Sequence, residues 1–182
     1  MLTESMRTES CDQLEYRTGH EGWKRWLTWI LGLAIGLAMW LGWSAAAGAE
    51  NYAKEFLVGV DFSGRDLTDS SFTKANCREA NFSQSDLRGV SFFAANLEAA
   101  NLSGANLSNS TLDTARLSQA DLTNAILEGA FAFNAKFEGA KIDGADFTDV
   151  QLREDAQELL CRNANGVNPV TGRATRETLY CD

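Results

Sequence analysis

Side chains that could perform acid–base or nucleophilic catalysis are scarce in this chain of 182 residues. The only histidine is His20, so any mechanism that needs two imidazoles is excluded. Serine and threonine are plentiful, but no histidine follows residue 20 to activate their hydroxyl groups. We therefore predict no catalytic residue, no cofactor-binding residue and a non-enzymatic protein.

Carboxylates gather near the C-terminal end, at Asp143, Asp146, Asp149, Glu154, Asp155 and Glu158. A calcium site would need several of these oxygens to converge in one loop. Their even spread is more typical of a solvated acidic rim, so we predict no metal site. The formal net charge of −9 leaves no basic surplus to displace counterions from a nucleic acid, and we predict no nucleic-acid binding.

The first 49 residues have the pattern of an export signal. A polar stretch, 1–22, precedes Lys24 and Arg25, and the 18 residues of 26–43 carry no charge. A basic flank, an apolar run and a small-residue end are typical of a secretory signal peptide. We predict that 1–22 is a cytoplasmic lead-in and that everything after residue 50 is exported.

Two outcomes remain open for the hydrophobic segment, 23–49. As a signal peptide it is cleaved between Ala49 and Glu50. As a helix, however, its apolar run reaches about 27 Å, close to the thickness of a bilayer core. It would then stay as a membrane anchor, in which Gly32 and Gly36 form a pattern that packs membrane helices together.

A period of five residues runs through 60–154. Large apolar side chains fill 17 of 19 successive positions, with Cys77 and Ala132 as the exceptions. The register is Phe62, Leu67, Phe72, Cys77, Phe82, Leu87, Phe92, Leu97, Leu102, Leu107, Leu112, Leu117, Leu122, Leu127, Ala132, Phe137, Ile142, Phe147 and Leu152. Two residues before each stands Ala, Ser or Val, except at Arg65.

Neither a continuous helix nor a continuous strand places residues five apart on one buried side. The chain must therefore turn once in every repeat, and Asn, Asp, Ser and Gly at the remaining positions suit tight turns. Stacked coils then join backbone to backbone at about 4.8 Å.

Several units, among them Ala100-Asn101-Leu102 and Ala120-Asp121-Leu122, resemble the A(D/N)LXX motif of the pentapeptide-repeat family. The resemblance implies an all-β solenoid: a right-handed, four-sided β-helix of about five coils. We expect short helical caps at 50–59 and in the C-terminal region, 155–182, with one hydrophobic signal or anchor helix before them. Residues 154–161 read as the C-terminal helix.

The four cysteines divide by position. Cys77 falls in a core column of the four-sided arrangement, and Cys11 lies on the other side of the membrane. Cys161 and Cys181 are therefore the expected disulfide pair of an exported chain. The signal, the coils and this C-terminal tail are together similar to thylakoid-lumen pentapeptide proteins of cyanobacteria and chloroplasts, which implies a thylakoid lumen or a periplasm as the compartment.

The repeat is broken at Ala132, where phenylalanine stands on both sides of a small core residue. Phe131 and Phe133 share one side of the four-sided rod with Phe93, so we predict a protein-docking patch of these three residues. The alternative is a local bulge that turns Phe131 or Phe133 inward to fill the gap beside Ala132.

Two function hypotheses follow. The first is an exported interaction scaffold that binds another protein and aids assembly or protection of membrane complexes. The second follows from the resemblance, because some pentapeptide proteins mimic a DNA duplex and bind a nucleic-acid enzyme. The charge after residue 49 is −8, from 12 basic and 20 acidic residues, and permits mimicry, whereas export argues against it.

Overall fold

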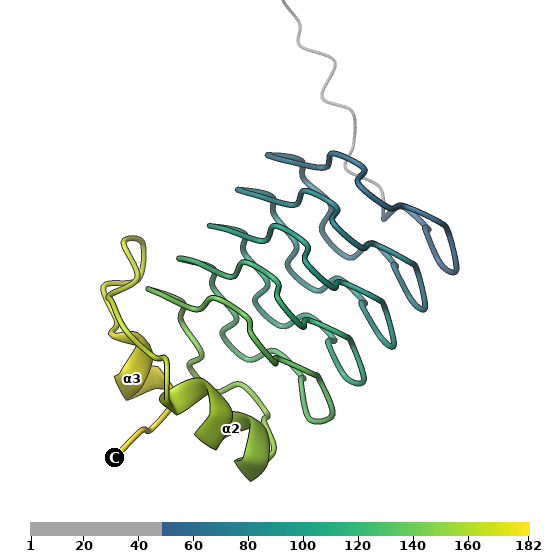
Figure 1. Ribbon diagram of the computed structural model, residues 1–182. Coiled ribbons are helices and arrows are strands. Elements are labelled where there is room, and N and C mark those ends of the chain that lie inside the picture. The colour runs from purple at the N-terminus through teal and green to yellow at the C-terminus, as the bar shows by residue number, and fades with distance from the viewer. Residues whose placement is uncertain (1–48) are drawn as a thin grey trace, which may run out of the picture. The chain divides into compact units, whose positions relative to one another are not determined.

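The computed structural model describes residues 49–182, which form a parallel β-helix followed by a short C-terminal extension (Figure 1). Seventeen parallel bridges join residues twenty positions apart, from Asn51↔Ser71 to Phe131↔Gln151. Each coil therefore has four sides of five residues, and each side contributes a single bridged residue. Coils 1 to 5 begin at residues 51, 71, 91, 111 and 131, and residues twenty apart stack in columns.

A β-turn with one left-handed residue closes every side of coils 1 to 5 except the side that ends at Ala135. In a typical unit, the Ala105 N–H donates to the Leu102 carbonyl at 3.1 Å, and Gly104 has a φ of +65°. This is the geometry of a type II turn, which requires a positive φ at its third residue. Asn101 accepts a hydrogen bond from the Ser103 N–H at 3.1 Å, which explains why Asn or Asp precedes the core leucine.

The five-residue register fills the interior as expected from Phe62 to Phe147, while its last member, Leu152, is only partly buried. Phenylalanines of the first coils stack in columns, with ring centroids 5.1 Å apart for Phe62 and Phe82 and 5.0 Å for Phe72 and Phe92. Cys77 is buried in the same core, and burial raises the pKa of its thiol to about 12. The thiol therefore stays protonated and has little reactivity.

The first coil begins earlier than the sequence predicts. Residues 51–58, assigned to a helical cap over 50–59, instead form the first two sides of coil 1. The helix prediction was wrong because Tyr52 and Leu57 already occupy the core register. Their N–H groups donate to carbonyls of coil 2 at 2.7 and 2.8 Å, so the chain gains the same ladder there as elsewhere.

Arg65 covers the open end of coil 1, which explains its departure from the small-residue register. Its guanidinium lies 5.4 Å from the ring centroid of Phe62 and 3.4 Å from the Glu50 carboxylate. The Tyr52 hydroxyl also donates to Glu50. This polar group shields the first aromatic rings, as the terminal repeat of a solenoid requires.

The predicted C-terminal helix is confirmed as α2, Glu154–Cys161. The chain then returns towards coil 5, forms an antiparallel bridge between Val167 and Ala174, and enters the short helix α3, Thr175–Thr178 (Figure 1). Leu160 of α2 is buried, so the amphipathic pattern of the helix covers the last coil.

The predicted lead-in, 1–22, and all but the last residue of the hydrophobic segment, 23–49, lie outside the described residues. Ala49 and Glu50 are both exposed, and cleavage between them stays a prediction. Between residues 49 and 182, neither helix has the length and apolar character needed to cross a membrane.

The ladder and the core predict how stability is distributed along the rod. Replacing Leu102 with Ala, in the fully buried middle of the rod, should lower the free energy of unfolding by about 2–5 kcal/mol. Leu57→Ala, in the half-exposed first coil, is the matched control and should cost clearly less. Urea unfolding followed by circular dichroism measures both, and an equal loss at the two positions would contradict a core centred on the middle coils.

Candidate docking surface

The break in the repeat leaves the backbone ladder intact. Ala132 is fully buried, while Phe131 and Phe133 on either side are 46% and 56% exposed. The Phe131 N–H donates to the Ser110 carbonyl at 2.9 Å, and its own carbonyl accepts from Leu112 at 2.7 Å. The alternative of a bulge that turns a phenylalanine inward was therefore wrong, because the register continues through coil 5.

Larger neighbours occupy the space that Ala132 leaves. Phe137 and Phe147 enter the core from opposite sides of coil 5, and their ring centroids are 6.5 Å apart. Volume lost on one side of the coil is thus compensated on the two adjacent sides, which is how cores tolerate such exchanges. Phe131 and Phe133 are not needed to fill the interior.

The turn that presents Phe133 differs from the other turns in coils 1 to 5. Asn134 is the residue at this turn position, within the described coils, whose φ is not positive. Its N–H and side-chain amide instead donate back to the Asp113 carboxylate at 3.0 and 3.1 Å. The Arg153 carbonyl, which stands where the next coil would offer an acceptor, accepts from the Gln157 N–H of α2 at 3.0 Å.

Phe93 and Phe133 lie in one column, two coils apart, with Asp113 between them. Phe93 is 38% exposed, and Phe131 belongs to the same side of the rod. We call these three phenylalanines the aromatic patch. Phe133 also borders a groove between coil 5 and α2, lined by Phe133, Leu152, Arg153, Glu154, Asp155 and Glu158.

Charge is unevenly placed around the aromatic patch. Lys54 and Lys74 occupy the same turn position of this side in coils 1 and 2, and both are exposed. Glu154 and Glu158 lie at the opposite end, in the groove beside Phe133. Within residues 49–182, none of these four side chains forms an ion pair.

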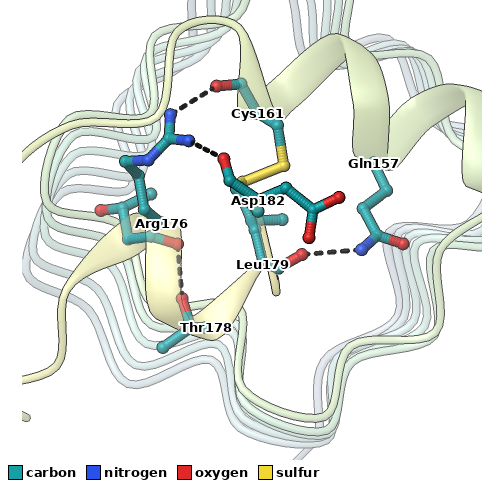
Figure 2. Close-up of a disulfide and its surroundings, with 8 residues drawn as sticks. Gln157, Cys161, Arg176, Thr178, Leu179 and Asp182 are labelled. Carbon is teal, nitrogen blue, oxygen red and sulfur yellow. Dashed lines mark hydrogen bonds between the residues drawn. A yellow bond between two sulfur atoms is a disulfide. The ribbon is translucent and has the colours of Figure 1, made fainter.

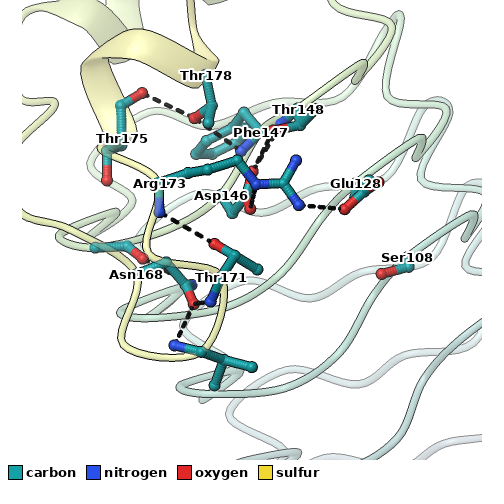
Figure 3. Close-up of polar contacts among 12 residues, drawn as sticks. Ser108, Glu128, Asp146, Phe147, Thr148, Asn168, Thr171, Arg173, Thr175 and Thr178 are labelled. Atoms are coloured by element: carbon teal, nitrogen blue, oxygen red, sulfur yellow. Dashed lines mark hydrogen bonds and ion pairs between the residues drawn. The ribbon is translucent and has the colours of Figure 1, made fainter.

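Arg173 fastens the C-terminal tail to coils 4 and 5 (Figure 3). Its guanidinium lies 2.6 Å from the Glu128 carboxylate and 3.0 Å from Asp146, which is fully buried. Burial opposes ionisation of Asp146. The Thr148 N–H and hydroxyl, at 3.0 and 2.6 Å, together with Arg173 outweigh it, so the pKa of Asp146 is lowered.

The tail also replaces the coil that would otherwise follow coil 5. The side-chain amide of Asn168 donates to the carbonyls of Asn124, Ala125 and Gly144 at 3.2, 3.3 and 2.9 Å. The Phe147 N–H, which would otherwise reach a next coil, donates to the Thr178 hydroxyl at 3.0 Å. Side chains of the tail thereby satisfy part of the edge of coil 5 that faces away from coil 4.

The predicted disulfide between Cys161 and Cys181 is present and closes the tail onto α2 (Figure 2). Arg176 donates to the Cys161 carbonyl at 3.2 Å and to the Asp182 backbone oxygen at 2.6 Å. Gln157 donates to the Leu179 carbonyl at 2.7 Å. The disulfide and these hydrogen bonds therefore hold the last residues of the chain against α2.

No group of three His, Cys, Asp or Glu side chains between residues 49 and 182 is placed to hold a metal ion. Carboxylates on the coils are spread over several columns, in one of which Asp66 and Asp86 are bridged neighbours. Asp146 pairs with Arg173 and accepts from Thr148.

Comparison with known proteins agrees with the coil geometry. Residues 65–147 match the family description of a pentapeptide repeat region. A pentapeptide repeat protein from the Arabidopsis thaliana thylakoid lumen, solved by crystallography, is 46% identical with a TM-score of 0.70, over 71% of this chain and 90% of that one. The chain belongs to the pentapeptide-repeat family.

Two further comparisons extend the likeness. The Arabidopsis thaliana thylakoid lumenal 15 kDa protein 1, chloroplastic, is 61% identical over 41 residues, which is 22% of this chain and 18% of that protein. The match thus spans under a fifth of that curated relative's length. A pentapeptide repeat protein from the cyanobacterium Cyanothece 51142 is 28% identical, with a TM-score of 0.52, over 53% of this chain and 79% of that one.

The pentapeptide motif locates the coils but does not show which residues cover the C-terminal end of the rod. Asn168, Arg173 and Thr178 carry no motif that predicts their roles, because each acts on a residue at least 24 positions away. The turn-rich stretch 163–172 was a signal for a compact tail. It did not identify which coil the tail would cover.

The ion pair between Arg173 and the buried Asp146 predicts that the free energy of unfolding depends on pH. Because the pKa of Asp146 is lowered from 3.8 by folding, its ionised form stabilises the fold above that value. The contribution is lost as the pH falls through the lower folded-state pKa. Asp146→Asn should therefore reduce the difference in unfolding free energy between neutral pH and pH below 4. Asp143→Asn, which removes an exposed carboxylate from the same coil, should leave that difference unchanged in urea titrations.

The disulfide predicts a local effect. In the chain-entropy model, closing this loop contributes roughly 3 kcal/mol, so Cys161→Ser with Cys181→Ser should lose about that much stability. Hydrogen exchange should then speed up at Phe147 and in α3, while the N–H groups of coils 2 and 3 stay protected. Uniform deprotection of the whole rod would contradict a role limited to the lower end.

Proposed function

We propose that this pentapeptide-repeat protein is a non-enzymatic interaction scaffold of the thylakoid lumen, which binds a protein partner through the aromatic patch. A role in assembling or protecting membrane complexes fits such a scaffold. The observation that carries the proposal is that Phe93, Phe131 and Phe133 are exposed together on one side of the rod and take no part in the core.

Three exposed phenylalanines on a ladder-bonded rod form an anchor that is already in its binding geometry. Aromatic side chains dominate the energetics of protein interfaces, and a rigid surface loses little conformational entropy on binding. The Asp113–Asn134 hydrogen bonds and the continuous ladder at Phe131 hold the patch in place. The groove beside Phe133 adds a depression lined by Leu152 and by four charged residues.

The lumenal compartment is supported by the predicted export signal and by the thylakoid-lumen relatives. The disulfide between Cys161 and Cys181 is also typical of an oxidising compartment. A scaffold located there could meet the lumen-exposed parts of membrane complexes.

Removing the aromatic patch tests the proposal. The triple variant Phe93→Ser, Phe131→Ser, Phe133→Ser should lose co-purifying proteins from native membranes, because its anchor is gone. Its circular dichroism and urea midpoint should change little, since the replaced side chains are exposed. Phe56→Ser removes a phenylalanine that is 86% exposed in coil 1 and should keep the partners. Identical co-purification with the triple variant and with Phe56→Ser would overturn the proposal.

A further inference from the structure

We propose that the occupant of the aromatic patch is a second copy of this chain, packed side to side with its rod antiparallel to the first. The inference rests on the proposed function, because it names the partner of the same surface. The order of side chains along the column that holds Phe93, Asp113 and Phe133 supports this dimer.

That column is self-complementary about coil 4. Phe93 stands one coil above Asp113 and Phe133 one coil below it, so the two rings are about 10 Å apart along the rod. A two-fold axis perpendicular to this side, passing through coil 4, places Phe93 of one copy against Phe133 of the other. The same operation repeats the contact, as an isologous interface requires.

The charges at the two ends of this side obey the same symmetry. Lys74 lies two coils above the proposed axis, and Glu154 begins α2 two coils below it. The two-fold operation brings Lys74 of one copy to Glu154 and Glu158 of the other, and Lys54 falls beyond them. These side chains are exposed and form no ion pair within residues 49–182, so they are available to a partner.

Asp113 sets a limit on the strength of this contact. It lies beside the proposed axis, where the carboxylates of the two copies approach each other. Both of its hydrogen bonds go to Asn134 in its own chain. Removing its charge while keeping an acceptor for Asn134 should therefore strengthen the association.

The contact is small, and this determines how it must be measured. Five coils make a side about 24 Å tall. An interface of that height, extended by α2, falls at or below the roughly 1,200 Å² that separates transient from standard interfaces. The dimer should therefore dissociate on dilution. A two-fold arrangement uses up the patch of each copy and so closes at two chains without forming a fibre.

Sedimentation velocity on the full chain in a mild non-ionic detergent, across a wide concentration range, measures the association. We expect a reversible monomer–dimer equilibrium. Phe93→Ser or Phe133→Ser should weaken it by at least about tenfold, and Phe56→Ser should leave it unchanged. Asp113→Asn should tighten it. Lys74→Glu should weaken it, and the triple variant Lys74→Glu, Glu154→Lys, Glu158→Lys should restore it.

Cross-linking tests the antiparallel geometry in a Cys11→Ser background. Thr114→Cys, beside the proposed axis, should give covalent dimers with a short bismaleimide. Gln84→Cys is the matched control, because Gln84 has the same φ of 58° at the same turn position on the opposite side of the rod. Equal cross-linking at both positions would overturn the proposal.

Three other outcomes would also overturn the dimer. They are a monomer at every concentration, a dimer indifferent to Phe93→Ser and Phe133→Ser, and a dimer lost only with Gly36→Leu in the predicted hydrophobic segment. If the chain is monomeric while the patch variants still lose co-purifying proteins, the dimer fails and the interaction scaffold stands. If the patch variants change neither readout, both fail.

Discussion

Hydrogen bonds that run along the axis of the rod, from one coil to the next, are the interaction on which the rest of the structure depends. The Leu102 N–H donates downward to Asp121 at 2.7 Å, and the Asn101 N–H donates upward to Ala80 at 2.9 Å. A coil is therefore held by both neighbours, and its side chains must repeat every twenty residues. Any coil at an end of the rod is left with half of these bonds unmade.

The two ends of the rod solve this problem differently. Coil 1 exposes its upper edge and covers its aromatic core with Arg65, Glu50 and Tyr52. Coil 5 is covered by a tail in which Asn168 donates to two carbonyls of coil 4 and one of coil 5, and Thr178 accepts from the Phe147 N–H. The disulfide and the buried Asp146 keep that tail in place, so the lower end depends on oxidation and on ionised carboxylates in a way the upper end does not.

The aromatic patch arises where the repeat meets the lower end. The chain leaves the coil at Arg153, and in the turn above it Asn134 donates back to Asp113. Ala132 leaves room that Phe137 and Phe147 take, which frees the flanking phenylalanines from the core. A rod of stacked coils repeats its surface from coil to coil, so the departures from the repeat are what distinguish this side from the others.

A strict period of five residues predicts the coil and its core, since both depend on a local pattern repeated in phase. The pairing of Cys161 with Cys181 was expected on a different ground, the export of the chain, and is confirmed. Local patterns also indicate α2 and the outward positions of Phe93, Phe131 and Phe133. Folding decided the rest: the start of coil 1 at residue 51, the reversed turn at Asn134 and the pairing of Arg173 with Glu128 and Asp146. Those features join residues that share no periodic signal. Which of many polar side chains meets an unpaired carbonyl or a buried carboxylate is settled only when the coils have stacked and their edge has taken its position in space.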